Sequence, residues 1–136
     1  MKLYLIRHGE TDWNKVHRIQ GSSDIELNEY GRELAFMTRE GLRHVPFDIG
    51  YTSPLKRAKE FLEDMILPNE NKYQHVAVFS HGAWIHSLLT HIYGRDIDEF
   101  WHAPRQENCG VTTIEVKGGE CHVLKESEIF YNKDGE

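Results

Sequence analysis

Two histidine–glycine pairs lie where the sequence changes abruptly from apolar to polar residues. His8-Gly9 follows a short apolar run near the N-terminus, and His81-Gly82 follows a second run at residues 75–80. Runs of this length, bounded by glycine and charged residues, are typical of buried strands that end in a loop. A neutral imidazole can attack phosphorus if its other ring nitrogen donates a hydrogen bond. The two pairs are therefore the first candidates for a reactive site.

The elements around these pairs follow the pattern of one α/β domain, residues 1–136. Apolar runs typical of strands alternate with stretches whose apolar residues recur at helical spacing. This alternation predicts right-handed βαβ units and a three-layer fold, with a mostly parallel sheet and helices on both faces. The expected strands are residues 2–6, 47–52, 75–80, 111–116 and 121–124, and the expected helices begin at the caps Asn28 and Ser53 and directly after Gly82.

The predicted topology brings the two histidines together. Parallel strands end at the same edge of a sheet, and such sheets bind ligands outside those carboxyl ends. His8 and His81, although far apart in the sequence, should therefore share one site. Helices are expected to stop at Pro68 and Gly94, a hairpin is expected at residues 117–120, and the tail after Ile129 is expected to fray.

Composition and charge exclude several classes of function. The chain has 136 residues, a net charge of -6 and a pI near 5.8, which disfavours nucleic-acid or membrane-surface binding. An anionic substrate must therefore meet a local cluster of positive charge. Cys109 and Cys121 form no ligand or redox motif and are expected to be small apolar residues near strands. Without a signal or membrane-spanning segment, a cytoplasmic location is expected.

Four separate blocks carry a family resemblance. Arg7-His8-Gly9-Glu10-Thr11 reads as R-H-G-x-T after a strand, and Trp13-Asn14 follows it closely. The other blocks lie at residues 20–31, 51–58 and 80–82, in the same order as in the family. Together they resemble the histidine phosphatase superfamily, which includes the cofactor-dependent phosphoglycerate mutases.

The resemblance implies a role for each matching residue. His8 would be the nucleophile that forms a phosphohistidine, and His81 a second phosphate-binding histidine. Arg7 and Arg57 would hold the equatorial oxygens of the transferring phosphoryl group. No metal and no organic cofactor is implied. The remaining substrate-binding candidates are Asn14, Gly9, Gln20, Gly21 and Gly82.

The chain departs from the family in its middle. Only 24 positions separate Arg57 from His81, where the family usually has a long insert that supplies a glutamate to protonate the leaving oxygen. No general acid can be named here. Glu10 lies at a position that the family does not use for this role, and the carboxylates of the remaining helix (Glu60, Glu63 and Asp64) match no acid motif.

The expected activity is hydrolysis of a small phosphomonoester, or of phosphohistidine, through phospho-His8. Phosphoglycerate mutase is the alternative within the enzyme class, and a non-catalytic phosphate-binding domain is the alternative outside it. The expected partner is a small phosphorylated metabolite or inorganic phosphate, without nucleic acid or membrane, and a homodimer is an option. No catalytic role is expected for Arg18, Arg105, His17, His44, His86, His91, His102 or His122.

Overall fold

A computed structural model of the chain describes residues 1–9, 27–52, 58–96, 98–99 and 106–131. Its centre is a five-stranded sheet with the order β2-β3-β1-β4-β5. The strands are β1 (Lys2–Arg7), β2 (Ile49–Thr52), β3 (His75–Ser80), β4 (Val111–Lys117) and β5 (Glu120–Glu128).

The sheet combines a parallel part with an antiparallel hairpin. β1 and β2 both pair with β3 in parallel, whereas β4 runs against β1 and β5 runs against β4. The parallel strands are the three that the alternation of strands and helices predicts. The hairpin turns at Gly118 and Gly119, whose positive φ angles of 60° and 77° suit a tight turn between antiparallel strands.

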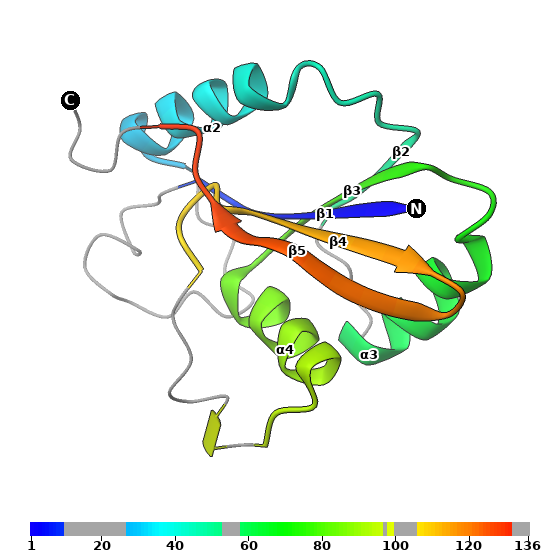
Figure 1. Cartoon of the computed structure of the whole chain (residues 1–136). Helices are drawn as coiled ribbons and strands as arrows, with labels where there is room; N and C mark the ends of the chain where they lie inside the picture. The colour runs from blue at the N-terminus through cyan, green and yellow to red at the C-terminus, as the bar shows by residue number, and fades with distance from the viewer. Residues whose placement is uncertain (10–26, 53–57, 97, 100–105, 132–136) are drawn as a thin grey trace.

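Helices cover both faces of the sheet, which confirms the predicted three-layer α/β fold (Figure 1). α2 (Glu29–Leu42) lies on one face, and α3 (Ala58–Phe61) and α4 (Gly82–Tyr93) lie on the other. Asn28 is the N-cap of α2, because its Oδ1 accepts a hydrogen bond of 2.7 Å from the Gly31 N–H. Gly94 ends α4 with a φ of 66°, as the sequence predicts.

The two faces of the sheet are unequally covered. On the side of α3 and α4, a cluster of twelve buried residues fills the space between helices and sheet. On the side of α2 the corresponding cluster contains only Tyr4, Ile6, Ala77 and Val111. Large hydrophobic side chains of the described residues, Phe47 and Phe79 among them, remain more than one third exposed. The face of α2 is therefore the one on which apolar surface stays open.

Several boundaries differ from the sequence expectation. β2 begins at Ile49 rather than residue 47, because the Asp48 carboxylate accepts hydrogen bonds from the N–H groups of Gln74 and His75 and so closes a turn. β5 continues to Glu128, beyond the expected residue 124. Beyond Ile129, the Tyr131 hydroxyl donates to the Asn108 carbonyl at 2.6 Å. The rest of the tail for which fraying is expected, residues 132–136, lies outside the described residues.

The helix between β2 and β3 is irregular. After α3 it continues as a π-helix (Leu62–Ile66) and a 3₁₀-helix (Leu67–Asn69). Pro68 therefore lies inside the last turn, one residue before the helical segment ends. Within the described residues, no helix has the length and hydropathy that crossing a bilayer requires.

Candidate active site

His8 and His81 meet at the carboxyl ends of β1 and β3. Arg7 pairs with Ser80 in the register of the two strands, and the His8 N–H donates to the Ser80 carbonyl at 3.2 Å. The two imidazole rings are 5.1 Å apart between centroids, at an interplanar angle of 67°. A single phosphoryl group can therefore contact both rings, as the topology predicts for this edge of the sheet.

One hydrogen bond determines which nitrogen of His8 is available. His8 Nδ1 lies 2.7 Å from the Gly9 carbonyl oxygen, which can only accept. Nδ1 must therefore carry the proton, so that the neutral ring presents its lone pair on Nε2. This is the arrangement that nucleophilic attack by imidazole requires.

The surroundings of His8 favour its neutral form. Burial lowers the pKa of His8 below the usual 6.5, and the nearby charges of Arg7 and His81 lower that pKa further, whereas the hydrogen bond to Gly9 opposes them. Since only a neutral imidazole can act as a nucleophile, the fraction of molecules in which His8 is neutral rises with pH through a midpoint below 6.5.

We expect an NMR titration of the His8 ring in the free protein to show a midpoint below pH 6.5. Arg7→Met should raise that midpoint, since it removes a neighbouring positive charge. The acid limb of kcat/KM should move in the same direction. A midpoint at or above 6.5 in the wild-type protein would contradict this account of the site.

Arg7 is held by a loop that the sequence motifs did not single out. Its Nη1 donates to the Gln106 carbonyl, and its backbone N–H donates to the Gly110 carbonyl at 3.1 Å. The buried Gln106 side chain in turn accepts a hydrogen bond of 3.2 Å from Thr112. Residues 106–110 therefore orient a candidate phosphate ligand, although no sequence pattern marks them, because their contribution is mainly through backbone carbonyls.

Because Gly82 has no side chain, the Arg7 side chain can pack closely against it. A Cβ atom at this position would lie 3.0 Å from Arg7 Nε and 3.3 Å from Arg7 Cδ and Cζ. α4 begins at Gly82, and the His81 side chain makes no capping hydrogen bond that would compete with an anion for the first turn of the helix. The absence of a side chain at Gly82 therefore makes room for the Arg7 side chain.

Gly82→Ala should reduce kcat/KM about tenfold, because Arg7 must shift by a few tenths of an ångström while small misplacements already impair phosphoryl positioning. Thermal stability should hold or rise slightly, since alanine favours the helix. Gly94→Ala is the matched control. It has open space around it but a φ of 66°, so it should lower Tm and leave kcat/KM unchanged. Equal activity losses in the two variants would refute the role assigned to Gly82.

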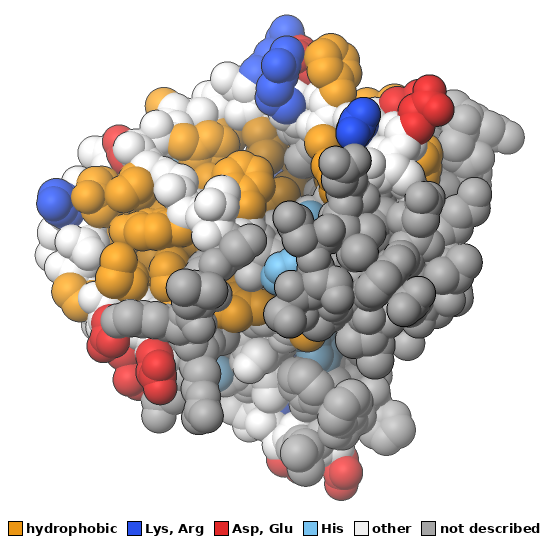
Figure 2. Space-filling model, turned by 180° about the vertical axis from the view of Figure 1, so that it is seen from behind, with side chains coloured by type: hydrophobic (Ala, Val, Ile, Leu, Met, Phe, Trp, Pro, Cys, Tyr) orange, Lys and Arg blue, Asp and Glu red, His pale blue; other side chains and the backbone are white. Residues whose placement is uncertain are grey.

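A groove of about 650 Å³ opens beside the two histidines, between α2 and the sheet. Hydrophobic side chains form a broad patch on one face of the molecule, and histidine side chains lie at its border (Figure 2). No aspartate or glutamate is among the described residues that line the groove. Besides Arg7, His8 and His81, the lining includes Ile6, Ala35, Leu42, Val45, Phe47 and Phe79.

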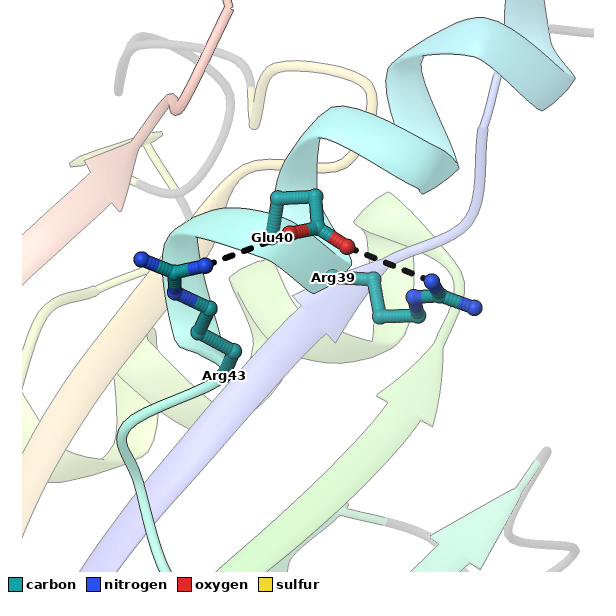
Figure 3. A network of polar contacts seen from close by, with 3 residues as sticks. All are labelled: Arg39, Glu40 and Arg43. Atoms are coloured by element: carbon teal, nitrogen blue, oxygen red, sulfur yellow. Dashed lines mark hydrogen bonds and ion pairs between the residues drawn. The ribbon is translucent and has the colours of Figure 1, made fainter.

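Two further arginines line the groove, Arg39 in α2 and Arg43 directly after it. Arg39 Nη2 lies 3.2 Å from one carboxylate oxygen of Glu40, and Arg43 Nη1 lies 3.9 Å from the other (Figure 3). The single carboxylate of Glu40 pairs with both guanidinium groups, so these three side chains together carry a net positive charge. In a chain of net charge -6, this is a local positive region of the kind that an anionic substrate needs.

The comparison with known protein families decides the assignment. The sequence pattern of the histidine phosphatase superfamily (branch 1) matches residues 3–69 and 59–128. The chain belongs to the histidine phosphatase superfamily. The two matched stretches share residues 59–69, which are the irregular helix between β2 and β3. This one helix corresponds to two parts of the superfamily pattern, which agrees with a middle segment that is shorter in this chain than in the pattern.

Two curated superfamily relatives are phosphatases by name. The chain is 45% identical over 74 residues to the uncharacterized phosphatase PhoE of Bacillus subtilis, a match that covers 54% of this chain and 36% of PhoE. It is 32% identical over 127 residues to phosphoserine phosphatase 1 of Hydrogenobacter thermophilus, over 88% of this chain and 56% of that protein. The chain thus spans about a third to a half of the length of these relatives.

Solved structures show the same fold. YhfR of Bacillus stearothermophilus matches with a TM-score of 0.75 at 24% identity, over 94% of this chain and 97% of that one. A phosphoserine phosphatase of Entamoeba histolytica, in complex with phosphoserine, also matches with a TM-score of 0.75 at 24% identity, over 93% of this chain and 96% of that one.

The structure brings part of the predicted site together. Arg7, His8, Gly9, His81 and Gly82 lie together at one edge of the sheet. Gly9 also allows its backbone to pack against α2, since a Cβ there would come within 2.6 Å of the Gly31 carbonyl oxygen. The other predicted site residues, Arg57, Asn14, Gln20 and Gly21, lie outside the described residues.

Proposed function

We propose that this chain is a phosphatase that hydrolyses phosphomonoesters through a covalent phosphohistidine on His8. The observation that carries the proposal is the hydrogen bond from His8 Nδ1 to the Gly9 carbonyl, which leaves Nε2 as the free nucleophile beside His81. Membership of the superfamily and the phosphatase relatives support the same reaction class.

The first step forms a bond between His8 Nε2 and phosphorus while the bond from phosphorus to the leaving oxygen breaks. Arg7, His81 and the N-terminus of α4 stabilise the negative charge on the equatorial oxygens. The Gly9 carbonyl stabilises the positive charge that develops on the ring. In the second step water attacks phosphorus, the nitrogen–phosphorus bond breaks, and inorganic phosphate leaves with neutral His8 restored.

The proton for the leaving oxygen comes from water in this proposal. The described lining of the groove contains no carboxylic acid that could supply it. Loss of general acid catalysis costs about 10²–10⁴-fold, and the cost is greatest for leaving groups that are strong bases. The proposal is therefore a phosphatase that favours good leaving groups. A mutase, which needs the acid in both half-reactions, is not proposed.

The test is acid-quench labelling with radiolabelled acetyl phosphate, with p-nitrophenyl phosphate turnover measured alongside. The expected result is turnover together with a protein-bound label that is stable to alkali and labile to acid. Absence of label and turnover, with phosphate still raising Tm, would select the non-catalytic phosphate-binding domain instead. Failure of phosphate to bind at all would exclude both functions.

A further inference from the structure

We infer that the groove between α2 and the sheet is the subsite for the leaving group, and that it selects phosphorylated compounds whose leaving group is apolar and carries no cation. The inference rests on the proposed function, because it takes the phosphoryl group to lie at His8 and His81.

Strand geometry connects the histidines to the groove. Successive side chains of a strand point to opposite faces, so Ile6 and Phe79 share the face of buried Tyr4 and Ala77, which pack on the side of α2. His8 and His81 come two residues after Ile6 and Phe79, directly beyond the ends of β1 and β3, and all four line the groove. A phosphoryl group on His8 therefore directs its leaving group into or across this groove.

The lining of the groove has a large apolar part, formed by Ile6, Leu27, Ala35, Leu42, Val45, Phe47 and Phe79. Of these, Phe79 is 44% exposed. The hydroxyl-bearing side chains of the lining are Thr38, Thr52 and Ser80; Thr38 and Ser80 are buried, and the Thr38 hydroxyl already donates to the Leu34 carbonyl at 2.7 Å. Burial of a carbon chain here would remove apolar surface from water on both the ligand and the protein.

Charge in the groove disfavours a substrate such as phosphoserine, whose amino group is positive. The described charged residues of the lining are Arg7, Arg39 and Arg43, and none is acidic. An ammonium group would thus meet three guanidinium groups, two of which, those of Arg39 and Arg43, share the single carboxylate of Glu40 outside the lining. An uncharged alkyl group avoids this repulsion, so charge and apolarity select the same class of compound.

The experiment measures binding of non-hydrolysable phosphonates by calorimetry, so that it does not depend on turnover. The Kd should fall along the series ethyl-, propyl-, butyl- and pentylphosphonate, by about two- to fourfold for each methylene, with fourfold expected for full burial. 2-Aminoethylphosphonate is the matched probe for charge, since it replaces the terminal methyl of propylphosphonate with an ammonium. It should bind about tenfold more weakly than propylphosphonate.

Two variants locate the effect in the protein. Phe79→Ala should flatten the dependence on chain length, because it removes an apolar side chain from the groove. Phe36→Ala is the matched control, since Phe36 is 58% exposed and is not among the groove residues. Both side chains are substantially exposed, so neither change should unfold the protein, and circular dichroism would verify this.

The outcomes separate the inference from the proposed function. Length-dependent binding without turnover of any ester would support the subsite and overturn the phosphatase. Turnover with a Kd independent of chain length would preserve the phosphatase and overturn the subsite. A length-independent Kd combined with a dimer that Phe79→Ala dissociates would assign the groove to a second copy of the chain, which also overturns the inference.

Discussion

His8→Ala is expected to lower kcat/KM for p-nitrophenyl phosphate by about 10⁴-fold or more, because it removes the imidazole that attacks phosphorus in the proposed mechanism. The label from acetyl phosphate should disappear in the same variant. Folding should be little affected, since within the described part of the chain the ring hydrogen-bonds only to the Gly9 carbonyl, at the edge of the groove. The expected change in unfolding free energy is about 1 kcal/mol or less.

His81→Ala is the matched control for this prediction. His81 also presents an imidazole to the site, 5.1 Å from His8 between ring centroids, but it is not the proposed nucleophile. Its loss should lower kcat/KM by about 10²–10³-fold, through weaker stabilisation of the transferring oxygens, while the label on the protein persists. If His81→Ala abolished the label and His8→Ala retained it, the two roles would be reversed.

The second large effect concerns the leaving group. Among substituted phenyl phosphates of similar size, kcat/KM should rise steeply as the phenol becomes more acidic, because the described groove has no acid to protonate a basic phenolate. Across the series the difference should reach about 10²–10⁴-fold. Substituents of similar size keep the apolar contacts constant, so the slope reports on the negative charge that develops on the leaving oxygen, which proton donation would reduce.

Phosphoserine phosphatase 1 of Hydrogenobacter thermophilus, of which this chain spans 56%, provides the comparison enzyme. A steeper slope for the present chain than for this longer relative is the expected result. Equal slopes would mean that an acid outside the described residues serves the reaction. Glu10→Gln would then be the first variant to examine, because Glu10 lies two residues after the proposed nucleophile.

Local sequence signals were sufficient to predict the elements that carry the site. The apolar runs ending at Arg7 and Ser80 indicated two parallel strands, and Asn28 and Gly94 marked helix boundaries through the caps that their side chain and backbone favour. Parallel strands share an edge, so the meeting of His8 and His81 followed from topology alone. These features depend on short-range periodicity and on general rules of chain connection, which a single sequence contains.

Other features required the tertiary structure. The free nitrogen of His8 depends on one carbonyl at 2.7 Å, and the orientation of Arg7 depends on the carbonyls of Gln106 and Gly110, about a hundred positions away. Every residue has a backbone carbonyl, so no residue type marks those that bind a side chain. The groove beneath α2 likewise depends on tertiary packing, which leaves the Phe79 side chain 44% exposed. The sequence by itself determined which groups can react, and only the packing of distant segments decided which atoms of those groups are available and what surrounds them.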